Sequence, residues 1–345
     1  MNQASIIEKQ RGLVERHGGL EADNVQLPRG FGASAQIALV LVGIVGFLVW
    51  AGTTALNVGF RHGMASLLVG AFVVLTICLG SLGWILIFHM VNAGWMATLR
   101  RQFENVMILI PIPVAIILAL VFAQIVILMT GDQTALLYAW MTEAASTDAL
   151  YSVKSAFLNP AFWAVRILLY GAIWCFLAFY MWSKSRGQDT SGDISLSRQA
   201  RFTSGWGLLA FALTTAFAGF DLLMSLDYRF FSTMWGVYVF AGAALSAVAT
   251  MVLIVCMLRL FGRLNGVVTE DHLHELGKLL FAFTVFWAYI GFSQYFLIWY
   301  SNIPEETAYY VGRSHGGWGT LGAVLIFGHF ALPFVVLLFR GVKRS

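Results

Sequence analysis

The chain has 345 residues, of which 59% are hydrophobic and only 11% are charged. An ordinary soluble domain carries about 25% charged residues, so this composition excludes that class. The formal net charge of +4 is small, and membrane topology accounts for the basic residues without a nucleic-acid partner. The class of protein that remains is an integral membrane protein.

The apolar residues gather in long runs along the chain. A helix needs about 20 residues to cross a hydrocarbon core of ~30 Å, whereas the strands of an outer-membrane barrel alternate in polarity over about 10 residues. The sequence therefore predicts an all-α integral membrane protein with about eight transmembrane helices. The predicted spans are residues 34–57, 65–91, 105–130, 161–182, 205–226, 233–260, 275–299 and 317–339.

Two polar segments set the predicted organisation. Residues 1–33 carry both charge signs and lack the apolar core of a cleaved signal, so we expect a cytoplasmic arm there. Residues 184–203 are also polar, and they separate four predicted spans from four. This division predicts two helical bundles, at 34–183 and 204–345, joined by a cytoplasmic linker.

The Lys and Arg residues are unequally divided between the two sides of the membrane. With the N-terminus inside, 16 of the 21 fall on the cytoplasmic side and 5 fall outside. Basic residues favour the cytoplasmic side, so both termini are expected there. The segments 131–160 and 300–316 then face outward, toward soluble partners. The five outside residues are Arg61, Lys154, Arg166, Arg229 and Arg313.

The sequence carries no motif for a bound redox cofactor. It has no C-x-x-C-H haem motif, no four-cysteine cluster pattern and no Walker phosphate loop, and its three cysteines stand alone in apolar spans. A membrane cytochrome b needs histidines paired across facing helices. The two histidines within predicted spans, His89 and His329, lie at different depths. We therefore expect no metal or cofactor on this chain, with any redox centres in other subunits.

Asp221 is the one acidic residue well inside a predicted span, where a charge costs at least ~2.5–3.5 kcal/mol. At helical spacing it shares a stripe with Thr214. Arg166, Tyr170 and Trp174 form a second stripe on the fourth helix, and Arg166 lies at a similar depth to Asp221, so it is the expected counter-charge. Two interpretations stay open: a structural ion pair, or a proton-relay or quinone-site carboxylate.

Other polar residues are candidates for the same path. His329 lies four residues before Pro333, which has no N–H to donate to the carbonyl of residue 329, so the eighth helix is expected to bend there. Its imidazole either passes protons or bonds to a neighbouring helix. Tyr289 is a candidate bridge near mid-membrane. His89 and Glu104 are candidates for the cytoplasmic mouth, although a solvated helix end is the simpler interpretation of each.

Four long stretches of the chain carry a resemblance to a known family. The stretches are HMVNAGWMATLRRQFE (89–104), LNPAFWAVRILLYGAIW (158–174), AFAGFDLLMSLDYRFFSTMWGVYVFAG (216–242) and LGKLLFAFTVFWAYIGFSQYFLIWYSNIPEET (276–307). With the spans between them, they cover most of the chain from about residue 85 to 335. They resemble, in order, segments of the smaller of the two large quinone-type membrane subunits of alternative complex III, which belongs to the NrfD/polysulfide-reductase membrane-anchor family.

The resemblance implies a complex in the bacterial cytoplasmic membrane that oxidises quinol, usually menaquinol. Electrons would pass through iron–sulfur and multihaem cytochrome c subunits to a periplasmic cytochrome or a terminal oxidase. It also implies that this chain binds no cofactor, packs against its larger quinone-binding homologue and other membrane subunits, and supplies a proton path. Family members of this type usually have about ten spans in two four-helix bundles with flanking helices, so the resemblance implies either an incomplete second bundle or a shortened variant of the subunit.

Two other functions compete with this one. The quinone-binding anchor of another NrfD-type oxidoreductase would differ in its partner, which would be a molybdopterin subunit rather than a multihaem cytochrome. A secondary transporter would have Gly- or Pro-broken helices at matching positions of its two halves. Pro111 and Pro113 in the first half do not correspond to Pro333 in the second, which disfavours the transporter.

Overall fold

A computed structural model describes residues 22–28, 30 and 32–344. Most of the predicted arm at 1–33 lies outside these residues. All regular elements of the described part are helices, and 8 helical segments are long and apolar enough to cross a membrane. The predicted all-helical class and the number of spans are confirmed. The helices are α2 (Ala22–Val25), α3 (Ala33–Thr53), α4 (Phe60–Val91), α5 (Arg100–Met107), α6 (Pro111–Thr130), α7 (Glu143–Ser146), α8 (Ala149–Lys154), α9 (Pro160–Ser191), α10 (Ile194–Leu222), α11 (Trp235–Leu260), α12 (Glu270–Ser301), α13 (Pro304–Arg313), α14 (Gly317–Ala323) and α15 (Leu332–Leu338).

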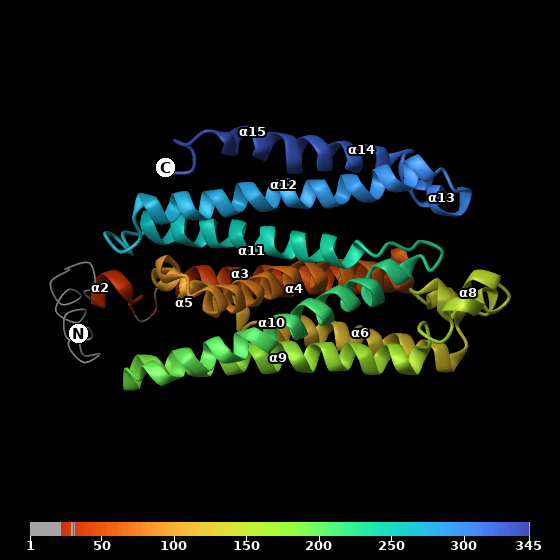
Figure 1. The fold of residues 1–345 in the computed structure, drawn as a ribbon. Helices are drawn as coiled ribbons and strands as arrows, with labels where there is room; N and C mark the ends of the chain where they lie inside the picture. The colour runs from red at the N-terminus through yellow and green to blue at the C-terminus, as the bar shows by residue number, and fades with distance from the viewer. Residues whose placement is uncertain (1–21, 29, 31, 345) are drawn as a thin grey trace.

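The long helices run side by side in an elongated bundle with α4 at its centre (Figure 1). Helix α4 packs against α5, α6, α10 and α11, while α9 packs against α6 and α10. Helix α12 covers α11, and the segment from α14 to α15 covers α12. In the most apolar window of α4, 67% of the residues are buried. The core of the protein therefore lies around α4.

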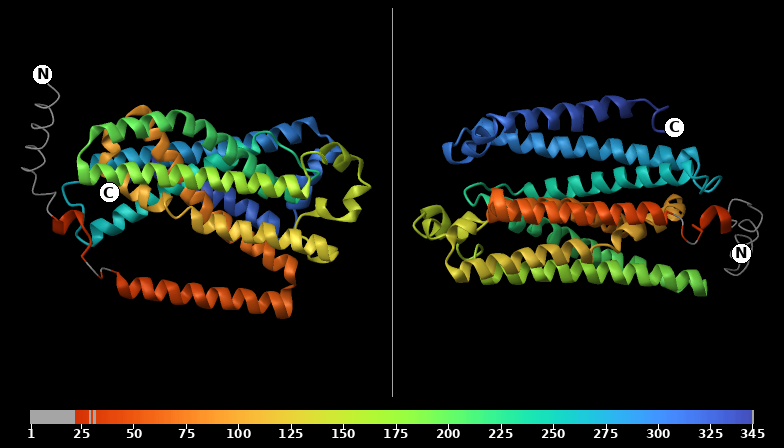
Figure 2. Two further views of the ribbon diagram at one scale, coloured as in Figure 1. Left: turned by 90° about the horizontal axis from the view of Figure 1, so that it is seen from below. Right: turned by 180° about the vertical axis from the view of Figure 1, so that it is seen from behind.

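Two apolar segments lie at the margin of the bundle. Helix α3 has no buried residue and stands apart from the other long helices in Figure 2 (left). The last span, Gly317–Leu338, is similarly open, with only 6% of its apolar window buried. These faces meet lipid or other protein rather than the core of this chain.

Small residues allow α4 and α11 to approach closely. A Cβ atom added at Gly80 would lie 2.0 Å from the carbonyl oxygen of Ala243 on α11. The indole Nε1 of Trp84, one turn further along α4, donates a hydrogen bond of 3.1 Å to the carbonyl of Ala244. Small residues are the usual means by which helices pack tightly in membranes, where the hydrophobic effect between helices is absent.

The predicted linker at 184–203 is almost entirely helical. Helix α9 continues to Ser191 and α10 begins at Ile194, so only Gly192 and Asp193 form the turn. Gly192 has a φ of 65°, the left-handed conformation that favours glycine at a helix end. The carboxylate of Asp193 accepts a hydrogen bond of 2.8 Å from the backbone N–H of Ser195 and caps α10. The polar composition therefore marks helix ends beyond the apolar spans, not an irregular linker.

Prolines shape two of the spans. The third predicted span is broken into α5 and α6, and Pro111 occupies the first position of α6, where a missing N–H is tolerated. The last span contains a π-helix, Val324–Ala331, directly before α15. This irregular turn includes His329 and lies where the freed carbonyl before Pro333 predicted a departure from regular α-helix.

The two ends of the bundle differ in their elements. Helices α2 and α5 and the end of α15 lie at one end, and α8 and α13 lie at the other (Figure 1). We call these the α5 end and the α13 end. The α5 end also holds the turn between α9 and α10.

Candidate functional site

A buried ion pair joins α9 to α10 near the α13 end. Arg166 donates from Nε to Oδ2 of Asp221 at 2.9 Å and from Nη2 to Oδ1 at 2.6 Å. The hydroxyl of Tyr170, one turn further along α9, donates to the same Oδ2 at 2.9 Å. Asp221 has 0% and Arg166 has 7% of its surface exposed. The expected counter-charge of Asp221 is therefore in place, in the bidentate geometry of a strong charge-assisted pair.

The backbone around Asp221 is held as firmly as its carboxylate. Helix α10 ends at Leu222, so its last carbonyls need partners from outside the helix. The carbonyl of Asp221 accepts hydrogen bonds from the indole of Trp163 at 3.0 Å and from the hydroxyl of Ser225 at 2.6 Å. The hydroxyl of Tyr138 donates to the carbonyl of Leu222 at 3.2 Å. These bonds fix the position of Asp221 opposite Arg166.

One donor of Arg166 remains open. Its Nη1 atom is buried and has no hydrogen-bond partner. The guanidinium carbon lies 3.9 Å from the ring centroid of Phe157 and 4.3 Å from that of Phe162, so aromatic faces also stabilise the cation. A buried donor of this kind is normally paired with a water or with a ligand.

The polar face shared by α9 and α10 continues for about two further turns toward the membrane centre. The indole of Trp174 donates to Oγ1 of Thr214 at 2.9 Å, and Thr214 donates to the carbonyl of Ala210 at 2.7 Å. The predicted stripes therefore face each other. Beyond Trp174 the buried residues of α9 are apolar as far as Ser185: Leu177, Ala178 and Met181.

A second buried carboxylate lies at the α5 end. Glu104 has 0% of its surface exposed, which corrects the expectation of a solvated helix end. Its Oε2 accepts a hydrogen bond of 2.7 Å from Ser185 and lies 3.0 Å from Nη1 of Arg101, and its Oε1 lies 3.3 Å from Nε of Arg100. Arg101 also pairs with Asp189 on α9. Burial is possible because two guanidinium groups and a hydroxyl surround the carboxylate.

The remaining candidates lie apart from both clusters. His89, near the end of α4, is partly buried, whereas Tyr289 on α12 has 63% of its surface exposed. His329 is exposed on the last span, and its ring contacts Trp287 edge to face at 4.5 Å between centroids. None of the three forms a hydrogen bond or an ion pair with Asp221 or Glu104. The side chains of this chain alone therefore do not connect Asp221 to Tyr289 and His329.

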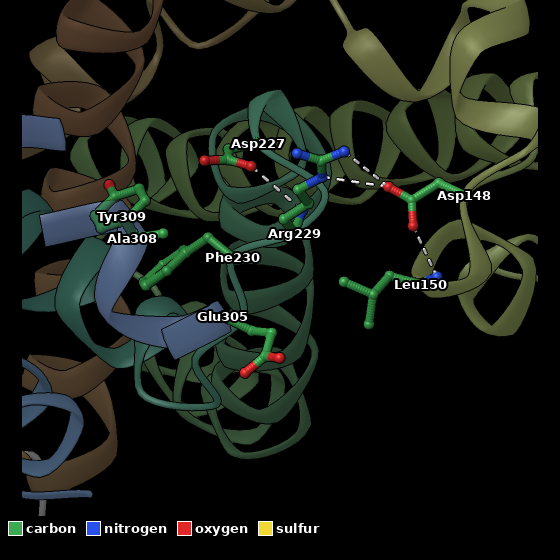
Figure 3. A pocket seen from close by; sticks show the side chains of 8 residues that line it. All are labelled: Asp148, Leu150, Asp227, Arg229, Phe230, Glu305, Ala308 and Tyr309. Atoms are coloured by element: carbon green, nitrogen blue, oxygen red, sulfur yellow. Dashed lines mark hydrogen bonds and ion pairs between the residues drawn. The ribbon is translucent and has the colours of Figure 1, made fainter. Parts of the chain in front are cut away.

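A pocket of about 500 Å³ opens at the α13 end beside α8 and α13 (Figure 3). Asp148 accepts hydrogen bonds from Tyr228 at 2.7 Å and from Nη2 of Arg229 at 3.0 Å, which hold the pKa of this carboxyl below its usual value. The lining residues of this pocket are Asp148, Leu150, Asp227, Arg229, Phe230, Glu305, Ala308 and Tyr309. The lining therefore contains three carboxylates and one guanidinium group.

Sequence reasoning missed several members of these clusters. Trp163 precedes Arg166 by three residues on the same helix face, so the α9 stripe extended by one turn would have included it. Ser185 and Asp189 lie in the segment interpreted as a linker, where no helical face was considered. Tyr138 lies in the long loop segment between α6 and α9, and no local pattern signals its contact with α10. Within the described residues, no group of three or more His, Cys, Asp or Glu side chains is arranged to hold a metal ion.

Eight apolar helical segments around buried ion pairs define the chain as a multi-pass, all-helical membrane protein. No protein-family model matches the sequence, and no curated protein is significantly similar to it.

Proposed function

We propose that the chain is the metal-free membrane subunit of a bacterial quinol-oxidising respiratory complex of the alternative complex III type. One observation carries this proposal: the buried charge clusters fall within the stretches that resemble that family. Glu104 ends the stretch 89–104, Arg166 and Tyr170 belong to 158–174, and Asp221 belongs to 216–242. Buried charges in membrane bundles are costly and usually functional, so the resemblance coincides with the chemically important positions.

The proposal also places the chain and its partners. The α5 end faces the cytoplasm, because most Lys and Arg residues lie there. The α13 end, with the acidic pocket, faces the iron–sulfur and multihaem subunits. Only 22% of the apolar window of α12 and 6% of that of Gly317–Leu338 are buried, which leaves this side for the larger homologous subunit.

Cysteine labelling tests the proposed orientation. A cysteine replacing Glu305 should react with a membrane-impermeant maleimide added outside intact cells, and a cysteine replacing Gln199 should react only after the membrane is opened. Both positions are exposed, and the native cysteines lie within the spans. Labelling of Gln199→Cys in intact cells would mean that the topology is the reverse of the one proposed.

Purification through a tag on this chain tests the proposed complex. The expected eluate contains a multihaem cytochrome c and an iron–sulfur subunit and oxidises menaquinol, while the chain expressed alone is colourless. A molybdopterin subunit in the eluate would favour the alternative oxidoreductase. A stoichiometric haem spectrum of the single chain, or a stable chain that never acquires partners, would contradict the proposal.

A proton-relay role at Asp221 deepens this function, and the open Nη1 of Arg166 favours it. A water bound to this atom would connect the ion pair to further proton carriers. Protons move through proteins along chains of hydroxyl groups and waters. The apolar residues between Trp174 and Ser185 mean that further waters or a partner subunit must complete the path.

Asp221→Asn should keep the complex assembled while lowering the number of protons released per electron. Assembly survives because the amide oxygen still accepts from Arg166, whose cation also keeps its contacts with Phe157 and Phe162. Proton release from proteoliposomes measures the proton stoichiometry. Native gels measure the assembly of the complex separately. Full proton stoichiometry in an assembled variant would end the relay proposal, and loss of assembly alone would favour the purely structural ion pair.

A further inference from the structure

A groove at the α5 end lies between the end of α4 and the first turns of α10. It has a volume of about 580 Å³ and is separate from both carboxylate clusters. Its lining combines two guanidinium groups with an apolar wall. The lining residues are Met90, Arg198, Arg201, Phe202, Gly205 and Trp206.

The two arginines of the groove are available to a ligand. Arg198 and Arg201 are exposed, lie one turn apart on α10, and form no ion pair or hydrogen bond within the described residues. Arg100 and Arg101, at the same end of the bundle, are instead paired with Glu104. Guanidinium groups without a carboxylate partner bind phosphate oxygens well, because their N–H groups match phosphate geometry.

The wall beside the arginines is aromatic and open. Phe202 has 79% and Trp206 has 46% of its surface exposed, and both follow the arginines toward the membrane centre. The ring of Trp206 lies 6.2 Å from that of Phe176 on α9, so the wall extends across two helices. Residues four apart are about 6 Å apart along a helix. The order of charge, aromatic ring and apolar surface along α10 is the order of phosphate, glycerol ester and acyl chain in a phospholipid.

Gly205 gives the groove its depth. A Cβ atom at this position would meet no other atom within 4 Å, so no neighbouring helix requires a glycine here. Its missing side chain leaves open space between Phe202 and Trp206 on the surface of α10. A lipid chain can lie in this space without displacing protein.

We propose that this groove binds one anionic phospholipid of the leaflet at the α5 end. The phosphate lies on Arg198 and Arg201, and one acyl chain lies along Phe202, Gly205 and Trp206. Basic pockets beside membrane helices select anionic headgroups in this way. The apolar wall distinguishes a lipid from free phosphate, which would use the arginines alone.

Native mass spectrometry of the full chain in detergent tests the proposal with dioleoyl-phosphatidylglycerol and dioleoyl-phosphatidylcholine as probes. One phosphatidylglycerol molecule should be retained in preference to phosphatidylcholine. Arg198→Ala with Arg201→Ala should weaken its binding roughly 30-fold, from the energy of two basic groups at an anionic surface. Gly205→Leu should also weaken it, because the added side chain fills the groove while both charges remain.

A matched control removes two charges from the same end. Arg259→Ala with Arg340→Ala should bind phosphatidylglycerol as the wild type does, because neither residue lines the groove. The arginine variants should unfold at the wild-type temperature, since these arginines make no contact with a carboxylate of the described residues. Gly205→Leu should unfold at the same or a higher temperature, since Gly205 has free space and leucine is the better helix former. Equal binding of both lipids, or wild-type binding by the Arg198/Arg201 double variant, would overturn the proposal.

Two further arms separate a lipid from other occupants. Inorganic phosphate in excess should not displace phosphatidylglycerol. Complete displacement, together with wild-type binding by Gly205→Leu, would assign the groove to a free anion and reject the lipid. In cells, the photoreactive substitution Phe202→benzoylphenylalanine should crosslink to lipid. Crosslinking to a protein would assign this surface to a partner subunit.

Discussion

Replacing Arg166 by methionine is expected to lower the free energy of unfolding by about 3–5 kcal/mol, because it leaves a buried carboxylate without its counter-charge. Asp221 would keep only the hydroxyl of Tyr170 as a donor to its carboxylate. Methionine retains much of the apolar stem of arginine, so the loss reports on charge rather than on packing. Equilibrium unfolding in mixed micelles measures the effect.

Two controls make this result specific. The double variant Arg166→Met with Asp221→Leu should recover most of the lost stability, since removing both members of a buried pair is often nearly neutral. Arg229→Met breaks the ion pair with Asp148, but the Arg229 side chain is 65% exposed, so this loss should be far smaller. If Arg166→Met unfolds within about 1 kcal/mol of the wild type, the carboxylate of Asp221 must become protonated or hydrated in the variant.

The fold could be predicted where a strong physical constraint acts over many residues. Each membrane span must be long and apolar, so the eight runs predicted the eight helical segments. Hydropathy does not detect helix beyond the membrane. It therefore did not predict that α9 and α10 extend well into the polar segment 184–203. It also does not show which span is central, since α3 is as apolar as many others yet buries no residue.

The ion pair between Arg166 and Asp221 could be predicted because charges within spans are rare and helical spacing places each on a known face. The burial of Glu104 could not, since it depends on Ser185 of α9 meeting the helix turn that holds Glu104 and Arg101. Tyr138 is a similar case, because its contact depends on where α10 ends. Local patterns identify which polar residues face inward, and long-range packing decides which of them meet.

Gly80→Val is the second substitution with a large expected effect, about 3 kcal/mol or more, at the upper end of the range for overpacking. The added Cβ would lie 2.0 Å from the carbonyl oxygen of Ala243 and 2.8 Å from the Cβ of Ala247. The first of these obstacles is backbone, which cannot rotate aside as a flexible side chain does. Helices α4 and α11 would have to separate, and the hydrogen bond from Trp84 to Ala244 would be lost.

Gly70→Ala provides the matched control on the same helix, because a Cβ at Gly70 meets nothing within 4 Å. Alanine also restricts the unfolded chain, so this variant should be as stable as the wild type or about 0.4–1 kcal/mol more stable. Thermal unfolding of the purified chain separates the two variants. Equal unfolding temperatures for Gly80→Val and Gly70→Ala would mean that α4 and α11 are not held in contact at Gly80.

Because α4 is also the helix against which α10 packs, loosening it should disturb the position of Asp221 opposite Arg166. Gly80→Val should therefore impair assembly of the complex even though Gly80 contacts neither residue.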